Sequence, residues 1–394
     1  MNTAREVVIV AVARTPFGRF GGALKNLSAV QLGARAMAEA MRRSGVDAAA
    51  VQALYAGVGM IGANVLTATR QALLLGSGLP ETTPSLGVDR ACCSGMTAIG
   101  LGFKEIRHGE SDLVLCGGFE SLSNTPFLWP RQRGTRPGAV EVADPLLLRA
   151  DFLDKAIARY TGEEAIGMGV DRLQQDRWAV SSHRKYFEAE AKGYFEFERF
   201  PIRESLATLA ADEGPRCDVS EEKLGDLSPV YQSPTITAGN APGLNDGAAF
   251  ILLASRSFAI AHGLRALAII HDYVQVAGGP TTGSHTPAVA LGKILDRTRR
   301  SVSDLTRIEI NEAFAATPLV SALFLAKGDR RGADGILDRT NLCGGAVAIG
   351  HPIGASGARL VMTLVNGLRL SGGLGVAAIC GGYGQGDATL IEAA

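Results

Sequence analysis

Three residues able to do covalent and acid–base chemistry lie in glycine-rich surroundings: Cys92, His351 and Cys380. Cys92 stands in the stretch RACCSG (90–95), directly before a predicted helix. Free N–H groups and the positive end of a helix dipole at such a position favour a lowered thiol pKa and therefore a nucleophilic thiolate. The alternative is a small buried residue, since free cysteine is among the most buried residue types.

His351 lies in the stretch NLCGGAVAIGHPIGASG (341–357). Pro352 disfavours helical geometry at His351, and the apolar spacing from Ile353 onward predicts a helix start. A histidine just ahead of a helix faces free N–H groups, which favour a neutral imidazole or a neighbouring anion. The local pattern fits a catalytic histidine and a histidine buried in a tight turn equally well.

Cys380 opens the stretch CGGYGQG (380–386), where glycines leave backbone N–H groups accessible, as an anion-stabilising site requires. We expect the other cysteines to be buried structural residues: Cys93, Cys116, Cys217 and Cys343. The sequence has no CxxC pair, and its cysteines are too few for a disulfide-stabilised scaffold. The cysteines therefore indicate reduced thiols in a cytoplasmic protein, with no metal site.

Length and composition limit the classes of protein to which the chain can belong. A chain of 394 residues suggests two or three domains. With 46% hydrophobic residues and 39 basic against 39 acidic side chains, the chain gives no reason to expect nucleic acid or an anionic membrane as partner. Its apolar runs are too short for membrane insertion, and the short N-terminal run continues into a turn rather than forming a signal peptide.

Predicted strands and helices alternate along the chain. We expect strands at residues 7–12, 51–59 and 112–116, and helices at 30–44, 67–75 and 96–108. This alternation indicates an α/β fold around a mainly parallel sheet.

The chain also repeats itself. Residues 93–95, a helix and the strand ending LCGGF (115–119) have a counterpart in residues 355–357, a helix and ICGGY (379–383). The repeat predicts two halves related by a pseudo-twofold axis, with a site between them. We assign residues 1–120 and 243–268 to the first half, 121–242 to an inserted loop domain and 269–394 to the second half.

Four motifs in this order resemble those of the thiolases: CxSG from Cys92, NEAF at 311–314, GGAxAxGHPxGxSG at 344–357 and CxGxGxG from Cys380. The start ARTPFGRFGG (13–22), the DEGPR box (212–216) and TAGNAPGLNDGAA (237–249) are also similar to that family. The resemblance spans both halves. It implies the duplicated α/β/α/β/α layered thiolase fold and the activity of acetyl-CoA acetyltransferases and 3-ketoacyl-CoA thiolases.

The resemblance implies a role for each reactive residue. Cys92 takes an acyl group from acyl-CoA while His351 accepts the thiol proton. Cys380 moves the α-carbon proton of a second acyl-CoA. His351 and a water held by Asn311 stabilise the enolate oxygen, and the N–H groups of Cys92 and Gly382 stabilise the thioester oxyanion.

The resemblance therefore implies that coenzyme A and acyl-CoA are substrates rather than tightly bound cofactors. It also implies that the chain assembles as a homodimer or as a dimer of dimers. Arg216 of the DEGPR box is the best candidate for the phosphates of CoA, and arginines 131, 133 and 136 are looser ones. The further CoA-binding residues implied are Met168, Ala241, Gly243, Ala313 and Phe314.

Three departures from the family pattern fall outside the reactive set. Pro242 replaces a common serine, Cys343 replaces an asparagine, and residues 167–169 read GMG instead of HMG, before a helix that we expect to be shortened. Two alternatives remain at this point. One is a decarboxylating condensing enzyme of the ketosynthase type, and the other is a lipid carrier or scaffold that keeps the fold without turnover.

Overall fold

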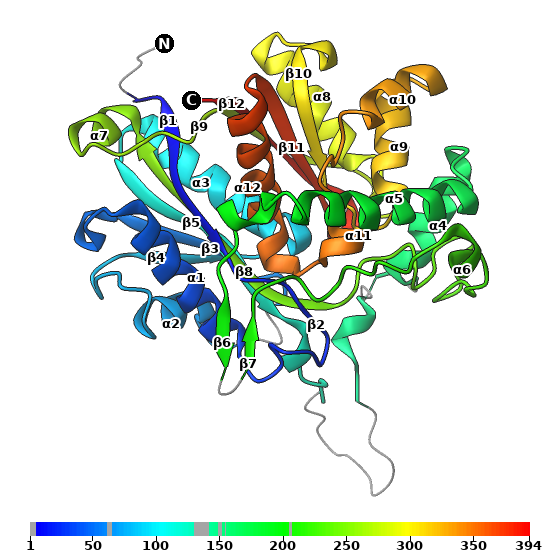
Figure 1. Cartoon of the computed structure of the whole chain (residues 1–394), viewed down its shortest axis with the longest axis horizontal. Coiled ribbons are helices and arrows are strands. Elements are labelled where there is room, and N and C mark those ends of the chain that lie inside the picture. Colours follow the sequence, from blue (N-terminus) through cyan, green and yellow to red (C-terminus); the bar gives the residue numbers. More distant parts are fainter. Residues whose placement is uncertain (1–4, 61–64, 130–141, 149–151, 154, 205–206) are drawn as a thin grey trace, which may run out of the picture.

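Strands and helices alternate along the chain in the computed structural model, which describes residues 5–60, 65–129, 142–148, 152–153, 155–204 and 207–394 (Figure 1). The strands are β1 Val7–Arg14, β2 Gly18–Arg19, β3 Ala53–Gly57, β4 Ser85–Val88, β5 Leu113–Ser121, β6 Ile202–Glu204, β7 Ala207–Leu209, β8 Asn245–Ser255, β9 Ala268–Ala277, β10 Leu305–Ile310, β11 Leu374–Gly381 and β12 Gln385–Ala393. The helices are α1 Ala29–Ser44, α2 Ala68–Leu74, α3 Ser94–His108, α4 Ile157–Gly167, α5 Arg172–Glu190, α6 Glu221–Gly225, α7 Arg256–Ala261, α8 Thr286–Thr298, α9 Ala316–Leu325, α10 Arg330–Leu337, α11 Ala346–Ile349 and α12 Ile353–Ser371.

Within the described ranges, ten strands form one mixed sheet in the order β10-β11-β12-β9-β1-β8-β5-β3-β4, and β2 pairs with β8. Apart from β4 and β2, this order is symmetric about the contact of β1 with β9. On one side β8 lies antiparallel to β1 and β5, and β5 lies parallel to β3. On the other side β12 lies antiparallel to β9 and β11, and β11 lies parallel to β10. The sheet therefore contains two halves of the same topology, which confirms the duplication predicted from the repeat.

The prediction of a mainly parallel sheet is wrong. Among the described strands, β8 and β12 make antiparallel ladders with both of their main neighbours. Every residue of β8 is buried, because helices cover both faces of the sheet. An antiparallel strand buried on both faces has the same continuous apolar sequence as a parallel one, so the sequence could not reveal its direction.

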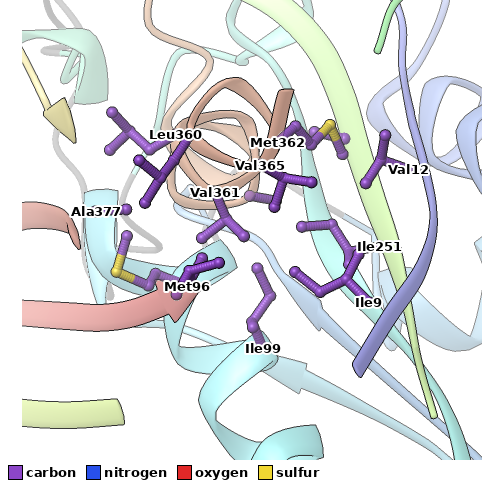
Figure 2. Packing of buried hydrophobic residues seen from close by; sticks show 14 of the residues in the cluster. Ile9, Val12, Met96, Ile99, Ile251, Leu360, Val361, Met362, Val365 and Ala377 are labelled. Atoms are coloured by element: carbon purple, nitrogen blue, oxygen red, sulfur yellow. The ribbon is translucent and has the colours of Figure 1, made fainter. Parts of the chain in front are cut away.

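Helices form three layers around the two halves of the sheet (Figure 1). α1 packs against β1, β5 and β8 on one outer side, and α8 packs against β9, β11 and β12 on the other. Between the halves lie α3 and α12, which contact each other and strands of both halves. Figure 2 shows the buried cluster that joins these central layers, including Ile9, Ile99, Val361 and Val365. Each such side chain contributes roughly 1.5–3 kcal/mol by leaving water.

Glycines allow α3 and α12 to approach closely where each helix begins. A Cβ atom at Gly95 of α3 would lie 2.5 Å from the carbonyl oxygen of Gly354 on α12, closer than real Cβ atoms come to such an atom. The two helix starts, one just after Cys92 and one just after His351, can therefore meet at the centre of the molecule.

The segment between β5 and β8 contains α4, α5, α6 and the β6–β7 pair. Helix α5 contacts α11, and α4 contacts α9, so the segment packs against the second half of the chain. None of the helices in the described part of the chain has the length and apolarity needed to cross a membrane.

Candidate active site

The reactive residues come from loops at the ends of central elements. Cys92 lies in a 3₁₀ turn, Ala91–Cys93, directly before α3. His351 lies between α11 and α12, and Cys380 is the second-last residue of β11. The 3₁₀ turn contacts both β11 and α12, so the fold brings the three predicted residues into one region.

His351 and Cys92 form a hydrogen-bonded pair. The Nε2 atom of His351 lies 3.0 Å from the Sγ atom of Cys92, and Nδ1 lies 2.6 Å from the Oγ atom of Ser356. The hydroxyl of Ser356 donates its proton to the carbonyl of Pro352 at 2.8 Å, so its oxygen must accept from Nδ1–H. The lone pair of Nε2 therefore faces the thiol and can accept its proton.

Both members of this pair are neutral in the free protein. Burial raises the pKa of Cys92 to about 12, with the charge of Glu120 acting in the same direction. Burial and the charge of Arg359 lower the pKa of His351 to about 4. The predicted neutral imidazole agrees with this, but the predicted lowering of the Cys92 pKa is wrong, because loss of water around the thiol outweighs the start of α3.

Cys380 lies on β11, and Asn311 directly follows the neighbouring strand β10. Burial raises the pKa of Cys380, and the charge of nearby Cys92 raises it further. Asn311 follows β10, and its N–H group donates to the carbonyl of Ala378 at 3.0 Å. Its side chain is fully buried, yet neither atom of the carboxamide has a hydrogen-bond partner among the described residues. A carboxamide held this way is available to a ligand or a bridging water.

Arg90 connects the loops of the two cysteines. Its guanidinium forms an ion pair with Asp387 and donates to Gln385 Oε1 at 2.8 Å, both on β12. Asp387 also accepts from the hydroxyls of Thr97 and Tyr273, each at 2.6 Å. This buried network fixes the turn of Cys92 against the hairpin that carries Cys380.

Two further residues hold His351 in place, and reading the sequence missed both. Asn245 Oδ1 accepts from the backbone N–H of His351 at 3.0 Å, while Asn245 Nδ2 donates to the carbonyl of Gly18 at 2.8 Å. Glu120 accepts from the N–H of Gly354 at 3.2 Å, at the start of α12. Asn245 lies inside the TAGNAPGLNDGAA stretch, which could have indicated its role. Glu120 follows the glycines of β5, and nothing else in the sequence indicates its role.

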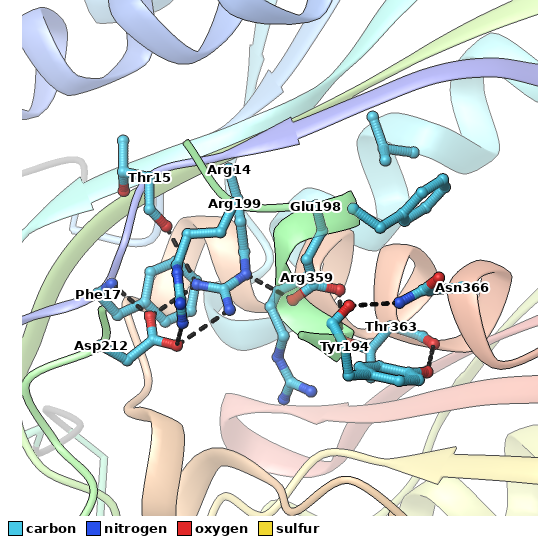
Figure 3. Close-up of polar contacts among 12 residues, drawn as sticks. Arg14, Thr15, Phe17, Tyr194, Glu198, Arg199, Asp212, Arg359, Thr363 and Asn366 are labelled. Carbon is cyan, nitrogen blue, oxygen red and sulfur yellow. Dashed lines mark hydrogen bonds and ion pairs between the residues drawn. The ribbon is translucent and has the colours of Figure 1, made fainter. Parts of the chain in front are cut away.

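The DEGPR box is anchored by a buried ion-pair network (Figure 3). Arg14 donates to both carboxylate oxygens of Asp212, at 2.7 and 3.0 Å, and to Glu198 at 2.6 Å. Burial opposes ionisation of Asp212, but the charge of Arg14 outweighs it and lowers the pKa of that carboxyl. Arg216, four residues further, is exposed, and its backbone N–H donates to His183 Nδ1 at 3.1 Å. The network therefore fixes the box while leaving the Arg216 guanidinium in solvent.

Most of the residues predicted to bind CoA lie near one another. Asn240, just before Ala241, accepts from the N–H of Ala315, just after Phe314, at 2.8 Å. A Cβ atom at Gly243 would lie 3.3 Å from Asn245 Oδ1, the acceptor of the His351 N–H group. Ala241 and Phe314 are partly buried against the same apolar cluster.

Met168 is also partly buried against this apolar cluster. It follows the last residue of α4 and lines a surface pocket with Leu323 and Phe324. Tyr160, in the first turn of α4, is buried. Burial raises the pKa of its phenol, and the charges of Tyr383, Cys380 and Cys92 raise it further. The eleven-residue α4 lies directly before Met168, and the nineteen-residue α5 begins at Arg172.

The remaining cysteines are free thiols. Cys93, Cys116 and Cys343 are buried as predicted, but Cys217 is exposed, because it follows Arg216 in the solvent-facing end of the DEGPR box. Arginines 131, 133 and 136 lie outside the described residues. The described residues contain no group of three or more His, Cys, Asp or Glu side chains arranged to hold a metal ion.

Comparisons with known proteins agree on one family. A family model described as "Thiolase, N-terminal domain" matches residues 7–257, and one described as "Thiolase, C-terminal domain" matches residues 264–393. The chain is 37% identical over 407 aligned residues to a beta-ketoadipyl-CoA thiolase of Pseudomonas knackmussii, with 99% of each chain covered. It is similar to the crystal structure of human mitochondrial 3-ketoacyl-CoA thiolase at a TM-score of 0.92 and 33% identity, covering 99% of both chains. It is also similar to the crystal structure of a thiolase from Ascaris suum in complex with coenzyme A, at a TM-score of 0.90 and 33% identity, covering 99% of this chain and all of that one.

Proposed function

The chain belongs to the thiolase family, and from this premise we propose that Cys92 carries the acyl group in a reversible Claisen condensation and thiolytic cleavage of 3-ketoacyl-CoA. Relatives named acetyl-CoA acyltransferase and beta-ketoadipyl-CoA thiolase place the enzyme among CoA-dependent acyltransferases. The observation that supports the nucleophile is the 3.0 Å contact of its Sγ atom with the free lone pair of His351 Nε2. The thiol proton passes to His351 as sulfur attacks the acyl carbon.

Carbon–carbon bond formation needs a second base, because Cys92 is then acylated. We assign this step to Cys380, which removes the α-carbon proton of the second acyl-CoA or returns it during cleavage. The contact of its strand β11 with the turn that carries Cys92 supports the assignment. His351, and a water held by the carboxamide of Asn311, would face the enolate oxygen, while the N–H groups of Cys92 and Gly382 would face the thioester oxygen.

We expect CoA to bind at this site, and we expect no tightly bound cofactor. Two of the similar solved structures are complexes with CoA. Arg216 is our candidate for its phosphates, and the loops of Ala241, Gly243, Ala313 and Phe314 for its pantetheine arm. Met168, which packs against the same apolar cluster as Ala241 and Phe314, is a further candidate contact. Arg216→Ala should raise KM for CoA several-fold with a smaller loss of kcat, as expected when uniform binding is lost. Arg42→Ala, at an exposed arginine of α1, is the control.

For the organisation of the chain, we propose residues 1–120 and 243–268 as the first half, 121–242 as the inserted loop domain and 269–394 as the second half. The position of α4 to α6 between β5 and β8 supports the insertion. The two matched family regions meet between residues 257 and 264, close to the proposed start of the second half.

We also propose a homodimer, with a dimer of dimers as the second possibility, and a cytoplasmic location. Among the described strands, β4 lies at one end of the sheet and packs against α2. Exposed apolar side chains lie on β4 and on or beside α2: Leu66, Leu74, Leu75 and Leu86. An open sheet edge beside apolar surface favours pairing with a second copy. The free thiols fit a reducing compartment. A monomeric mass in multi-angle light scattering at micromolar concentration would refute the dimer.

The two alternative functions fit less well. A decarboxylating condensing enzyme of the ketosynthase type resembles a Cys-His-His arrangement, whereas Cys380 occupies the third position here. A lipid carrier without turnover would have no need of a neutral Cys92–His351 pair held in hydrogen-bonding geometry. The decisive experiment mixes the protein with acetoacetyl-CoA and free CoA and follows loss of the enolate absorbance. A protein that binds acetoacetyl-CoA without consuming it would be a carrier.

A further inference from the structure

A cavity of about 730 Å³ lies at the opposite end of α3 from the reactive cysteines. It is lined by the last turns of α3, the residues that end α8 and the first half of β9. Helix α3 begins two residues after Cys92 and has fifteen residues, so a rise of about 1.5 Å per residue puts the cavity roughly 15–20 Å from that cysteine. Strand β1 begins and β12 ends at this side of the sheet (Figure 1). The cavity is therefore separate from the candidate active site.

The floor of the cavity is apolar and is held by regular structure. Its buried side chains are Phe103, Ile270, Tyr273, Leu374 and Leu390. Strand β9, which carries two of them, is paired with β1 on one side and with β12 on the other. A Cβ atom at Gly100 of α3 would lie 2.1 Å from the ring of Tyr273, so the glycine allows this ring to pack against the helix. The floor is thus a fixed surface, which suits a binding site better than a loop does.

The rim of the cavity is basic. Its basic residues are Lys104, Arg107, His108, His271, Arg297, Arg299 and Arg300. Two acidic residues also line the cavity, and each forms an ion pair: Glu6 with Arg256, and Asp272 with Arg297 at 2.6 Å. When only lysine, arginine and carboxylate side chains are counted, the lining carries a net charge of three positive, whereas the whole chain has 39 basic and 39 acidic residues. Positive charge is therefore concentrated at this cavity.

Basic residues at helix ends have a structural explanation, which covers only part of this rim. Arg107 and His108 lie in the last turn of α3, and Arg297 lies in the last turn of α8, where cations stabilise the helix dipole. The two helix C-termini together supply about one negative charge. This charge is smaller than the net charge of the lining, and Lys104 lies a turn earlier in α3 while Arg300 lies beyond α8. A surplus of about two positive charges remains for a ligand.

We propose that this cavity binds a small molecule that carries adjacent phosphate groups, at a site separate from the one proposed for CoA. Arginine guanidinium groups bind phosphate oxygens in pairs, and a lysine supplies a point charge. The Nζ atom of Lys104 lies 5.4 Å from the centroid of the Tyr273 ring, so its charge stands over the apolar floor. The floor accommodates the organic part of such a ligand, as in a nucleotide. The volume is within the range of small-molecule sites, about 300–1,000 Å³.

The test is isothermal titration calorimetry of the whole, CoA-free protein with two probes, inorganic pyrophosphate and ADP. We expect one-to-one binding of pyrophosphate that weakens as the salt concentration rises. Lys104→Ala and Arg300→Ala, both at exposed side chains, should each weaken binding of either probe roughly tenfold, because each removes a charge-assisted contact. Arg184→Ala, at an exposed arginine of α5, is the matched control and should leave the affinity unchanged. Acetoacetyl-CoA cleavage without a probe should be the same in all three variants.

ADP is also a part of CoA, so the proposed CoA site has to be separated from this cavity. Arg216→Ala should retain the binding that Arg300→Ala weakens. Tighter binding of ADP than of pyrophosphate would support a nucleotide as the ligand, through contacts with the apolar floor. Equal affinities would support a site that recognises the phosphates of free pyrophosphate as well.

Three results would overturn the inference. The first is that neither probe binds. The second is that Arg216→Ala abolishes binding while Lys104→Ala and Arg300→Ala bind as the wild type does, because the probes would then occupy the CoA site. The third is an equal loss in Arg184→Ala and Arg300→Ala, which would indicate attraction to the surface in general. Melting temperatures equal to that of the wild type show that the variants are folded.

Discussion

The same sequence pattern, cysteine followed by two glycines and an aromatic residue, occurs at equivalent places in the two halves with opposite outcomes. At Cys116 the strand β5 continues through the glycines to Ser121, and Gly117 and Gly118 pair with Phe250 and Ala249 of β8. At Cys380 the strand β11 ends at Gly381, and the chain turns back at once into β12. One cysteine is thus enclosed in the sheet, and the other ends at a reactive loop.

The residues after the glycines explain the difference. Phe119 packs its ring against α1 at Gly33 and stacks on Phe250, with centroids 6.4 Å apart, so apolar packing keeps β5 extended. After Cys380, Tyr383 and Gly384 both have positive φ, which no strand can accommodate. The two halves share a scaffold, and the backbone conformation after the glycines decides whether the cysteine of this pattern is enclosed in the sheet or lies at a loop.

The largest effect is expected at Cys92, which lies opposite the Cys380 loop. Cys92→Ala should abolish both CoA exchange into acyl-CoA and cleavage of acetoacetyl-CoA, because no acyl-enzyme can form. The matched control is Cys93→Ala, whose side chain is buried and whose thiol points to the carbonyl of Ile379 at 3.6 Å. Peptide mass spectrometry after a short incubation with acyl-CoA should find the thioester on Cys92. An adduct on Cys93 would contradict the assignment.

The next largest effect is expected for Cys380→Ala, and it should differ between the two half-reactions. If Cys380 handles only the α-carbon proton, the variant should keep CoA exchange and lose acetoacetyl-CoA cleavage by roughly 10²–10⁴-fold, the contribution of a positioned acid–base group. The measurement is both assays on the same preparation. Equal losses in the two assays would show that Cys380 serves thioester formation or the structure instead.

The sequence predicted the reactive residues because each stands in a local pattern with its own chemical reason: Cys92 before a helix, His351 before a proline and Cys380 in a glycine loop. It also predicted the duplication, which needs only a comparison of the chain with itself. The structure brings all three together through contacts of loops that lie up to 288 residues apart, as the difference between positions 92 and 380 gives.

The predictions that failed concern properties set by burial or by tertiary structure. The raised pKa of Cys92 reflects the loss of water around the thiol, which no local sequence reports. The direction of β8 is hidden because both of its faces are covered. The strain at Tyr383 is set by contacts with β9 and β12, so the sequence showed only a tyrosine among glycines.

The neutral state of the Cys92–His351 pair predicts a particular pH dependence. Because the pKa of Cys92 is about 12 and that of His351 about 4, the thiolate fraction at neutral pH is small and grows with pH. Alkylation of Cys92 by iodoacetamide in the free enzyme should accelerate about tenfold per pH unit, about a hundredfold between pH 6 and 8. Catalysis should instead be flat across this range and fall only as His351 is protonated near pH 4. A pH-independent alkylation rate would indicate a preformed thiolate–imidazolium pair.

The smallest effect is expected at Cys116, the counterpart of Cys380. Its thiol is fully buried in the core cluster between the sheet and α3, and burial raises its pKa well above the usual range, so it stays a protonated, apolar side chain. Cys116→Ala should therefore cost only about 1 kcal/mol of unfolding free energy through a small cavity, seen as a lower denaturant midpoint. Its kcat for acetoacetyl-CoA cleavage should match that of the wild type. If Cys116→Ala lost nearly as much activity as Cys380→Ala, both cysteines would take part in catalysis. The turn at Gly382 would then not explain the difference between them.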